Sequence, residues 1–595
     1  MQQPLVLFVD LSRKRFWVEE RPELFDKYLG GVGVGIKLLL EECPKGADPL
    51  GPENPIIFTV GQLNAFFPLA SKTVALFKSP HTGNLGESHA GGRSATAIRM
   101  AGYGAIVIKG SSNIPVYLVI TSRGVNFRDA SALWGMATYT TGRVIRERES
   151  GAGVRTIMRI GPAGERLVTY ACVVTETYRH FGRLGLGAVF GSKKLKAILI
   201  AGRLSLKPEN SKLYREVYKE IFDEITKSDL MKKYHELGTP INVLPLNKLG
   251  GLPTQNLSSA TFDQAENISG ESFAEKHLGR RVACSHCPVS CIHLAALREP
   301  YEHEPYFYKT RMISYDYEPI YALGSMLGIG STEGMLRLMD EAETLGLDVM
   351  STGVALAWAT EMLLKGLIGL EETGGLKLRW GNVEAYVKAA RFLVEQPTSF
   401  YMALARGVTY ASNHYGGKEF ALTFGDNEMP GYHTGPAAHL GFLTGSRHSH
   451  LDGAGYSLDE KMVKNGEKPS PPKIVEALLK EEAWRQILAS LVVCFFARAV
   501  YKPETVCKTL EVVGYKLTPE ELQRLGLEIL KHKLEFKFRE GFSFEKLSFP
   551  KRIFETQTPH GKLSKAFMEE ALKLYEEKVQ ALMEGKALNQ ASKEA

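Results

Sequence analysis

The sequence predicts an α+β protein in which a sheet-rich first third precedes a mainly helical remainder. Short β-branched runs interrupted by glycine fill the first two hundred residues, whereas apolar residues recur at helical spacing after about residue 205. A chain of 595 residues, 44% of them hydrophobic, is long enough for several domains with large cores. The glycine pair after Tyr415 suggests a further boundary, so we expect domains over residues 1–205, 206–415 and 416–595.

Strands and short helices alternate in the first domain. Residues 5–10 and 15–19 flank a polar turn and are expected to form a hairpin. The other expected strands are residues 55–59, 73–77, 105–109, 116–121, 155–160 and 197–201, and the expected helices are residues 22–28, 35–41, 93–101 and 139–149.

Helical signals dominate the rest of the chain. Ser331 and Thr332 are suited to cap a helix that stops at Gly346, and Ser351 and Thr352 open another that reaches Gly366. Residues 565–584 form a third amphipathic pattern. Glu343 and Asp348 flank the stop signal at Gly346, where the helix dipole disfavours carboxylates; this hints at a ligand with N–H donors, the alternative being a solvent-facing pair.

Composition excludes several classes of protein. No apolar run reaches 18 residues, so no membrane insertion is expected, and residues 487–497 are predicted to be buried core. The N-terminus lacks a positively charged leader, and Cys43, Cys172 and Cys507 are isolated thiols, which predicts a cytoplasmic protein. A net charge of +7, without basic blocks interleaved with aromatics, does not indicate nucleic-acid binding.

Three cysteines on one short loop are the strongest chemical signal. Cys284, Cys287 and Cys291 follow a C-x2-C-x3-C pattern, which places three thiolates close enough to hold one metal centre with a distant fourth ligand. Such a run favours an iron–sulfur cluster, because structural zinc usually takes two local ligand pairs. Zinc and unligated thiols are the alternatives.

Glycine clusters in the first domain are candidate anion cradles. Residues 30–35, 91–92 and 182–191 are glycine-rich, and backbone amides without a Cβ can approach phosphates closely. The basic residues in or beside these clusters are Lys72, Arg93, Arg183, Lys193 and Lys194. Ordinary turns with solvated charges are the alternative interpretation.

Several segments together resemble one family. They are Tyr28-Leu29-Gly30-Gly31, residues 78–83, Gly91-Gly92, Ala101-Gly102-Tyr103, residues 187–197, the cysteine triplet, Tyr317-Glu318, Leu345-Gly346-Leu347-Asp348 and Cys494. On these residues the chain resembles the tungsten-containing aldehyde:ferredoxin oxidoreductase family over essentially its whole length.

The resemblance implies an N-terminal β-sheet domain that carries a tungsten bis-pterin, followed by two mainly α-helical domains. It also implies a [4Fe–4S] cluster on Cys284, Cys287, Cys291 and Cys494. The pterins supply the sulfur ligands of tungsten, so no protein thiolate is needed there. The residues implied along the pterin phosphates and a bridging Mg²⁺ are Lys72, Gly91, Gly92, Arg183, Leu184 and Gly185, and Asp348 is implied to bond a pterin ring.

The sequence departs from the family at three places. His89 stands where the family usually has an asparagine that helps to bind Mg²⁺. Residues 489–494 lack the second pterin-binding carboxylate. The loop of residues 444–451 is one residue shorter than usual, so either His450 or His448 is the active-site histidine; we favour His450 because Leu451 then aligns.

The implied reaction is oxidation of a small aldehyde to a carboxylic acid with water. Glu318 is expected to act as general base with a pKa raised by burial, and His450 to bond the substrate oxygen or relay protons. Without the resemblance, Glu318 would be interpreted as an ordinary carboxylate before Pro319. Electrons would pass through the cluster to ferredoxin or a small iron–sulfur subunit, in a hetero-dimer or a homo-oligomer.

Three alternative functions remain open at this stage. The first is a tungsten-dependent aromatic-ring reductase that acts on an acyl-CoA. The second is a non-catalytic iron–sulfur electron carrier, against which the intact glycine segments argue. The third is a zinc-stabilised binding module.

Overall fold

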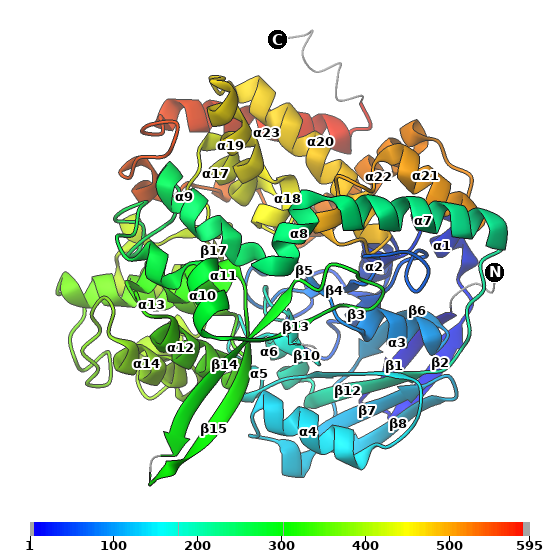
Figure 1. Cartoon of the computed structure of the whole chain (residues 1–595), viewed down its shortest axis with the longest axis horizontal. Helices are drawn as coiled ribbons and strands as arrows, with labels where there is room; N and C mark the ends of the chain where they lie inside the picture. Colours follow the sequence, from blue (N-terminus) through cyan, green and yellow to red (C-terminus); the bar gives the residue numbers. More distant parts are fainter. Residues whose placement is uncertain (1–4, 177, 302, 587–595) are drawn as a thin grey trace.

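The computed structural model describes residues 5–176, 178–301 and 303–586 (Figure 1). The first four residues, on which the expected absence of a leader partly rests, lie outside this range. The elements of the first part are β1 Leu5–Asp10, β2 Arg15–Glu19, α1 Pro22–Tyr28, α2 Gly31–Glu42, β3 Ile56–Thr59, β4 Thr73–Lys78, β5 Leu85–Ala90, α3 Ser94–Met100, β6 Tyr103–Lys109, β7 Val116–Thr121, β8 Gly124–Asp129, η1 Ser131–Leu133, α4 Thr138–Arg148, β9 Val154–Arg159, α5 Pro162–Glu165, β10 Val173–Thr175, β11 Arg179–Phe181, α6 Leu186–Ser192 and β12 Leu195–Gly202.

Two six-stranded mixed sheets form the N-terminal part, as the sequence predicts. Their strand orders are β2-β1-β6-β3-β4-β5 and β11-β10-β9-β12-β7-β8. One buried cluster takes apolar side chains from both sheets, among them Phe58, Ile106 and Ile198, so the two sheets share a core. The opposite face of the first sheet packs against α2 and two C-terminal helices, which buries its strands except the exposed edge strand β2.

The remainder of the chain is mainly helical, which confirms the predicted fold class. Its elements are α7 Ser211–Lys227, α8 Asp229–Glu236, η2 Thr239–Asn242, α9 Val243–Leu249, η3 Ala265–Ile268, α10 Gly270–Lys276, β13 Leu278–Val282, β14 Ile292–Tyr301, β15 Glu304–Tyr315, α11 Tyr317–Leu323, η4 Ser325–Leu327, α12 Thr332–Leu345, α13 Val349–Leu364, α14 Val383–Glu395, α15 Ser399–Leu404, α16 Val408–Tyr415, η5 Lys418–Phe420, β16 Thr423–Phe424, β17 Asn427–Glu428, α17 Pro436–Thr444, α18 His450–Gly453, α19 Gly455–Asn465, α20 Pro471–Ser490, η6 Phe495–Ala497, α21 Pro503–Val512, α22 Pro519–Arg539, η7 Phe544–Lys546, η8 Lys551–Phe554 and α23 Lys565–Met583. The domain boundaries stay predictions.

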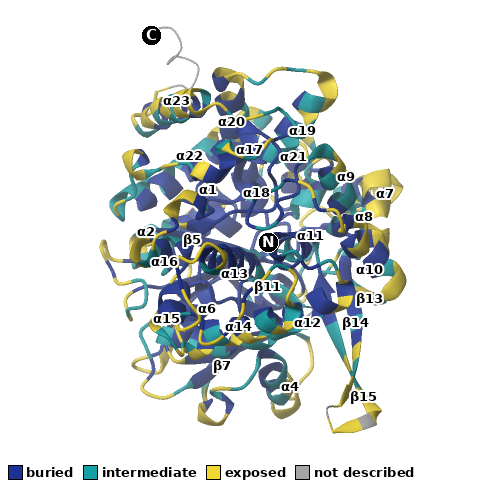
Figure 2. Cartoon of the chain, turned by 90° about the vertical axis from the view of Figure 1, so that its left-hand side faces the viewer, coloured by how far each residue is buried: buried dark blue, intermediate teal, exposed yellow. Residues whose placement is uncertain are grey.

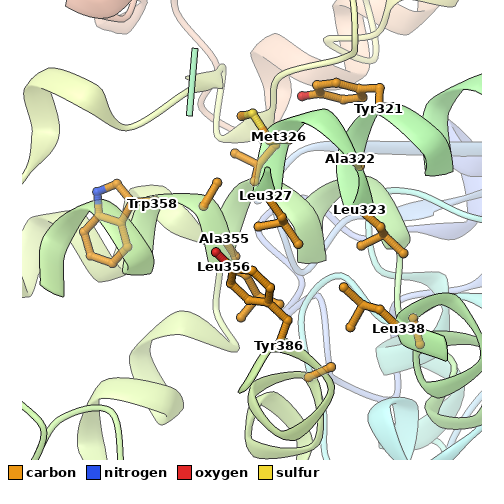
Figure 3. Close-up of a cluster of buried hydrophobic side chains, with 14 of the residues drawn as sticks. Tyr321, Ala322, Leu323, Met326, Leu327, Leu338, Ala355, Leu356, Trp358 and Tyr386 are labelled. Carbon is orange, nitrogen blue, oxygen red and sulfur yellow. The ribbon is translucent and has the colours of Figure 1, made fainter. Parts of the chain in front are cut away.

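Helices α11 to α14 pack on one another around large buried side chains. Figure 3 shows Leu323 of α11 beside Leu338 of α12, and Leu356 of α13 beside Tyr386 of α14. These side chains are almost fully excluded from solvent. The packing fixes the first turns of α11 and α13, from which Glu318 and Ser351 project.

A long hairpin, β14–β15, was not expected in the helical region. It begins directly after Cys291 and pairs over Ile292–Tyr301 and Glu304–Tyr315. Its far end projects from the body of the protein and is exposed (Figure 2). Mixed charged and aromatic residues at that end give no clean two-residue alternation, which explains why the pattern was missed.

Asp348 occupies a different position from the one expected. Helix α12 ends at Leu345 as predicted, but Asp348 is the N-cap of α13 and accepts hydrogen bonds from the amides of Met350 and Ser351. A carboxylate at a helix N-terminus is favoured by the dipole. The sequence predicted that α13 begins at Ser351 and that the helix dipole disfavours the Asp348 carboxylate. Both predictions are wrong. In the described part of the chain, no helix is both long and apolar enough to cross a membrane.

The core around α13 yields a stability prediction. Leu356 is fully buried, so Leu356→Ala should destabilise the fold by about 2–5 kcal/mol through lost burial and a residual cavity. The exposed Leu367, at 48% relative accessibility, offers a matched control, and Leu367→Ala should have little effect. Thermal unfolding followed by circular dichroism measures both. Equal melting temperatures for the two variants would contradict the packing described here.

Candidate active site

The loop before β4 joins the two cysteine segments through its backbone. The amide of Leu69 donates to the carbonyl of His286 at 3.2 Å, and the carbonyl of Leu69 accepts the amide of Cys494 at 2.9 Å. Three residues on, the amide of Lys72 donates to the carbonyl of Val492 at 3.1 Å. Cys494 is thereby held beside the cysteine triplet, although the two are far apart in sequence.

An internal cavity of about 350 Å³ collects most of the predicted site residues. Those that line it are Cys284, Cys287, Cys291, Cys494, Lys72, His89, Arg183, Leu184, Glu318 and His450. The cavity also receives Glu87, Arg179, Asp316, Tyr432 and Arg447, none of which was singled out from the sequence. Arg179 lies just before the glycine cluster at Gly182, a signal that could have been used; Tyr432 comes from a loop without a pattern.

The four cysteines that the family resemblance assigns to a cluster come together at one cavity. All are free thiols and all line the same cavity. Among the described residues, however, no group of three or more potential ligands is close enough to hold one metal ion. In a [4Fe–4S] cluster each thiolate binds a different iron, so the four sulfurs stand farther apart than around zinc.

Gly91 leaves space for one of these thiols. A Cβ built on Gly91 would lie 2.8 Å from Cys284 Sγ and 3.4 Å from Lys72 Nζ. Glycine is therefore required where the backbone after β5 passes the cysteine loop. Gly185 is restricted by its backbone instead, with φ +84° and a Cβ position 2.0 Å from the Thr169 carbonyl. Neither Gly91, Gly92 nor Gly185 lines the cavity itself.

Arg183 connects the main cavity to a smaller one of about 150 Å³ that Asp348 lines. Its Nε donates to Asp348 Oδ2 at 3.3 Å and its Nη2 to the Glu428 carbonyl at 2.7 Å. Arg183 Nη1 is buried without a hydrogen-bond acceptor among the described residues. A buried guanidinium N–H without a partner is costly, which suits a bound anion or carbonyl at this position.

Glu318 is paired with a histidine and a tyrosine. Its Oε1 lies 3.1 Å from His450 Nε2 and accepts from the Tyr432 hydroxyl at 3.0 Å. Burial alone would raise the pKa of Glu318, but the hydrogen bonds and charge of His450 together with Tyr432 lower it below 4.5. The expectation of a raised pKa was wrong because it ignored these partners.

His89 belongs to a buried charge network. Its Nε2 bonds Glu87 Oε1 at 2.7 Å, while Glu87 lies 2.7 Å from Lys533 Nζ and 3.5 Å from Arg447 Nε. Burial opposes ionisation of Glu87, yet Lys533 and Arg447 hold its pKa well below the usual range. Burial lowers the pKa of His89, which favours a neutral imidazole.

His448 points away from the cavity. Its Nε2 lies 2.9 Å from Lys537 Nζ, and burial beside this lysine lowers its pKa to about 3. His450 lines the cavity and contacts Glu318, as favoured from the alignment of Leu451. The geometry therefore does not support His448 as the active-site histidine.

Some predicted phosphate partners serve other purposes. Lys193 Nζ is buried and donates to the carbonyls of Gly51, Pro52 and Gly110, while Lys194 Nζ donates to the Asn113 carbonyl. Neither lysine lines the cavity. Both lysines tie loops of the first domain together.

Comparisons with known proteins identify the family of the chain. The family model described as "Aldehyde ferredoxin oxidoreductase, N-terminal domain" matches residues 6–202, and the model for domains 2 and 3 matches residues 216–580. The chain belongs to the aldehyde ferredoxin oxidoreductase family, a family of oxidoreductases. Membership of this family implies tungstopterin and typically a [4Fe–4S] cluster.

Two relatives and one solved structure are similar to this chain over most of its length. The tungsten-containing aldehyde ferredoxin oxidoreductase of Thermococcus kodakarensis is 32% identical over 93% of this chain and 92% of its own length. The aliphatic sulfonate oxidoreductase, WOR-like subunit, of Pyrococcus furiosus is 29% identical over 88% and 84%. The active-site complex BamBC of benzoyl coenzyme A reductase shares the fold, with a TM-score of 0.81 and 22% identity over 99% of this chain and 95% of that one.

The close approach of Gly91 to Cys284 gives a prediction. Gly91→Ala should displace the thiol, because the new Cβ would lie 2.8 Å from Cys284 Sγ, and iron per chain should fall. Gly369→Ala is a matched control, since the only atom within 4 Å of its Cβ position is the end of the flexible Glu372 side chain. Iron analysis and visible absorbance measure the effect. An unchanged iron content in the Gly91 variant would contradict the conclusion that glycine is required beside Cys284.

Proposed function

We propose that the chain is a tungsten bis-pterin oxidoreductase that oxidises aldehydes to carboxylic acids with water as the oxygen source. Two electrons would leave through a [4Fe–4S] cluster to ferredoxin or a partner iron–sulfur subunit. The observation that carries the proposal is the single cavity in which four cysteines, Arg183 and the Glu318–His450 pair meet.

The residues present fit the implied cofactors. Cys284, Cys287, Cys291 and Cys494 would hold the cluster, with the buried Lys72 beside three of the thiols compensating their negative charge. Lys72, Arg183 and Leu184 would contact the pterin phosphates, supported by the unpartnered Arg183 N–H, and Asp348 would bond a pterin ring. His89 would face the phosphates and a bridging Mg²⁺ as a neutral ligand. We retain residues 1–205, 206–415 and 416–595 as the proposed domains.

Glu318 would act as the general base. When bound, a tungsten bis-pterin supplies a two-electron acceptor and a Lewis acid that polarises a carbonyl. Glu318, ionised at neutral pH, would accept a proton from the water that adds to the aldehyde. Its second contact, His450 Nε2 at 3.1 Å, would pass that proton on or bond the substrate oxygen.

The cysteines also indicate where electrons leave. All four cysteines line one cavity with Arg183 and Glu318, so a cluster held by them would lie beside the proposed chemistry. Such a cluster would accept the electrons there, and ferredoxin or a small iron–sulfur subunit would be its acceptor.

The substrate class can be tested directly. Anaerobically purified protein should contain about one tungsten and four irons per chain and should reduce a viologen dye with aldehydes. The substrate panel should include an aliphatic sulfonate and an aromatic acyl-CoA, because one relative and one protein of the same fold are named after such substrates. Tungsten with activity only on one of these would replace the aldehyde proposal, and iron without tungsten would support an electron carrier.

Glu318 provides the sharpest mutational prediction. Glu318→Gln should lower kcat by roughly 10²–10⁴-fold, because an amide cannot accept the proton, while tungsten and iron contents stay unchanged. The exposed Glu545 gives a matched Glu→Gln control with full activity. Full turnover in the Glu318 variant would remove this carboxylate from the mechanism.

The pKa of Glu318 predicts a pH profile. Because its pKa is lowered, the acid limb of kcat/KM should lie below pH 4.5, with activity present above the limb and lost as pH falls through it. Tyr432→Phe removes one hydrogen bond to the carboxylate and should move the limb upward by up to about one pH unit. Tyr386→Phe, a core tyrosine bonded to Thr360, should leave the limb in place. A downward shift in the Tyr432 variant would contradict the assignment.

A further inference from the structure

A second hollow of about 1140 Å³ is separate from the main cavity, and the two share no lining residue among those described. The second hollow is an open groove bordered by α15, α16 and the loops around Leu50 and Asp426. His81 and Thr169 lie in its wall. A Cβ on Gly407, which also lines the groove, would lie 2.6 Å from His81 Cε1, so only glycine leaves the imidazole this close to the groove.

A continuous series of short contacts runs inward from His81. His81 Nε2 lies 2.8 Å from Glu428 Oε2, and Glu428 Oε2 lies 2.7 Å from Ser351 Oγ. Ser351 Oγ lies 2.6 Å from Asp348 Oδ2, which in turn accepts from Arg183 Nε at 3.3 Å. Every member except Arg183 is buried, and only Asp348 and Arg183 were predicted as site residues from the sequence.

Ser351 has too few hydroxyl hydrogens to donate in both of its contacts with carboxyl groups. Ser351 has one hydroxyl hydrogen but makes contacts of 2.7 and 2.6 Å to two carboxyl groups. An ionised carboxylate only accepts, so both contacts are hydrogen bonds only when one of the two carboxyl groups carries a proton. Ser351 then accepts from that carboxyl and donates to the other. Glu428, Ser351 and Asp348 therefore share one proton beyond those of the ionised groups.

The outer end of the series is suited to exchange this proton. His81 Nδ1 bonds the Thr169 hydroxyl at 2.9 Å, and Asp426 of the groove interacts with the imidazole electrostatically. Burial lowers the pKa of His81, but Glu428 outweighs it and the net pKa is raised. Burial likewise opposes ionisation of Glu428, whereas His81 and Ser351 lower its pKa to about 2. Glu428 is therefore the ionised carboxylate of the pair, and the shared proton lies between Asp348 and Ser351.

The inner end opens where the proposed chemistry takes place. Asp348 and Glu318 both line the 150 Å³ cavity, and Arg183 and Glu318 also line the main cavity. Oxidation of an aldehyde and a water to a carboxylate releases two electrons and three protons. A cluster removes only the electrons, so the protons need a separate exit.

We propose that Asp348, Ser351, Glu428 and His81 form a proton-transfer path from the active-site cavity to the groove at Thr169 and Asp426. A proton that reaches Asp348 bonds its carboxyl oxygen. The Asp348 O–H then passes to Ser351 Oγ while the Ser351 O–H passes to Glu428, and Glu428 delivers a proton to His81, which releases one to the groove. No other reactant is needed. This inference rests on the proposed function only for the origin of the protons.

Infrared difference spectroscopy of the holoenzyme tests the shared proton without substrate. Chemical reduction with dithionite should change the carbonyl stretch of a protonated carboxyl group, and that band should shift in D2O. Ser351→Ala should remove or displace the band, since the two carboxyl groups then lose their bridge. Ser351→Thr, which keeps the hydroxyl, should restore it.

Turnover gives the second readout. Ser351→Ala should slow kcat by about tenfold and increase the solvent isotope effect, less than loss of the general base because water can partly replace a hydroxyl. Ser412→Ala is a matched control, because Ser412 Oγ donates only to the Thr409 carbonyl at 3.1 Å. Tungsten and iron contents should stay at wild-type values throughout.

The outcomes separate the two proposals. A protonated-carboxyl band that depends on Ser351 supports the shared proton even when no aldehyde is oxidised. Absence of the band in wild-type protein, or an unchanged band and isotope effect in Ser351→Ala, would overturn the path while leaving aldehyde oxidation untouched.

Discussion

The backbone of Leu69 is the constraint on which the site depends. It bonds the cysteine loop through its amide and Cys494 through its carbonyl, and the next residues continue the pairing to Val492. Leu69 lies between β3 and β4 of the first sheet. Its backbone hydrogen bonds therefore attach both cysteine segments to that sheet. Because these are backbone hydrogen bonds, they do not depend on the identity of the side chains, and they hold Cys494 beside the loop of the other three cysteines.

Burial of many ionised groups is the second feature that shapes the site. Glu87 is enclosed with Lys533 and Arg447, and Arg447 also contacts Asp452 at 2.6 Å. A buried charge is tolerated only when it is paired, and loss of one partner leaves the other uncompensated. The network beneath His89 is therefore a rigid support, and its charges balance without solvent.

Two helix N-termini present the carboxylates of the site. Glu318 lies in the first turn of α11, and Asp348 caps α13, whose first turn carries Ser351. The packing of α11 on α13 brings Glu318 and Asp348 to the same cavity of about 150 Å³. A helix N-terminus favours negative charge, which agrees with a lowered pKa for Glu318. The same packing places Ser351 between Asp348 and Glu428 of β17.

The sequence by itself determined what depends on neighbours along the chain. Alternation and glycine placed β1, β2 and β7, and a serine before an apolar repeat placed the start of α12, because strand period and helix caps are local properties. The cysteine spacing likewise indicated a metal loop. Local signals failed at β14–β15, where the pattern is irregular, and at Asp348, where a stop and a cap lie two residues apart.

Tertiary structure alone decided which distant residues meet. In the folded protein Cys494 lies beside the cysteine triplet, and His450 rather than His448 contacts Glu318. Lys193 binds loop carbonyls instead of lining the cavity. Tertiary structure also joined His81, Glu428 and Ser351, which come from three separate segments. A pKa or a hydrogen-bond path depends on such partners, and the distance between two segments in space is set by the packing of sheets and helices between them.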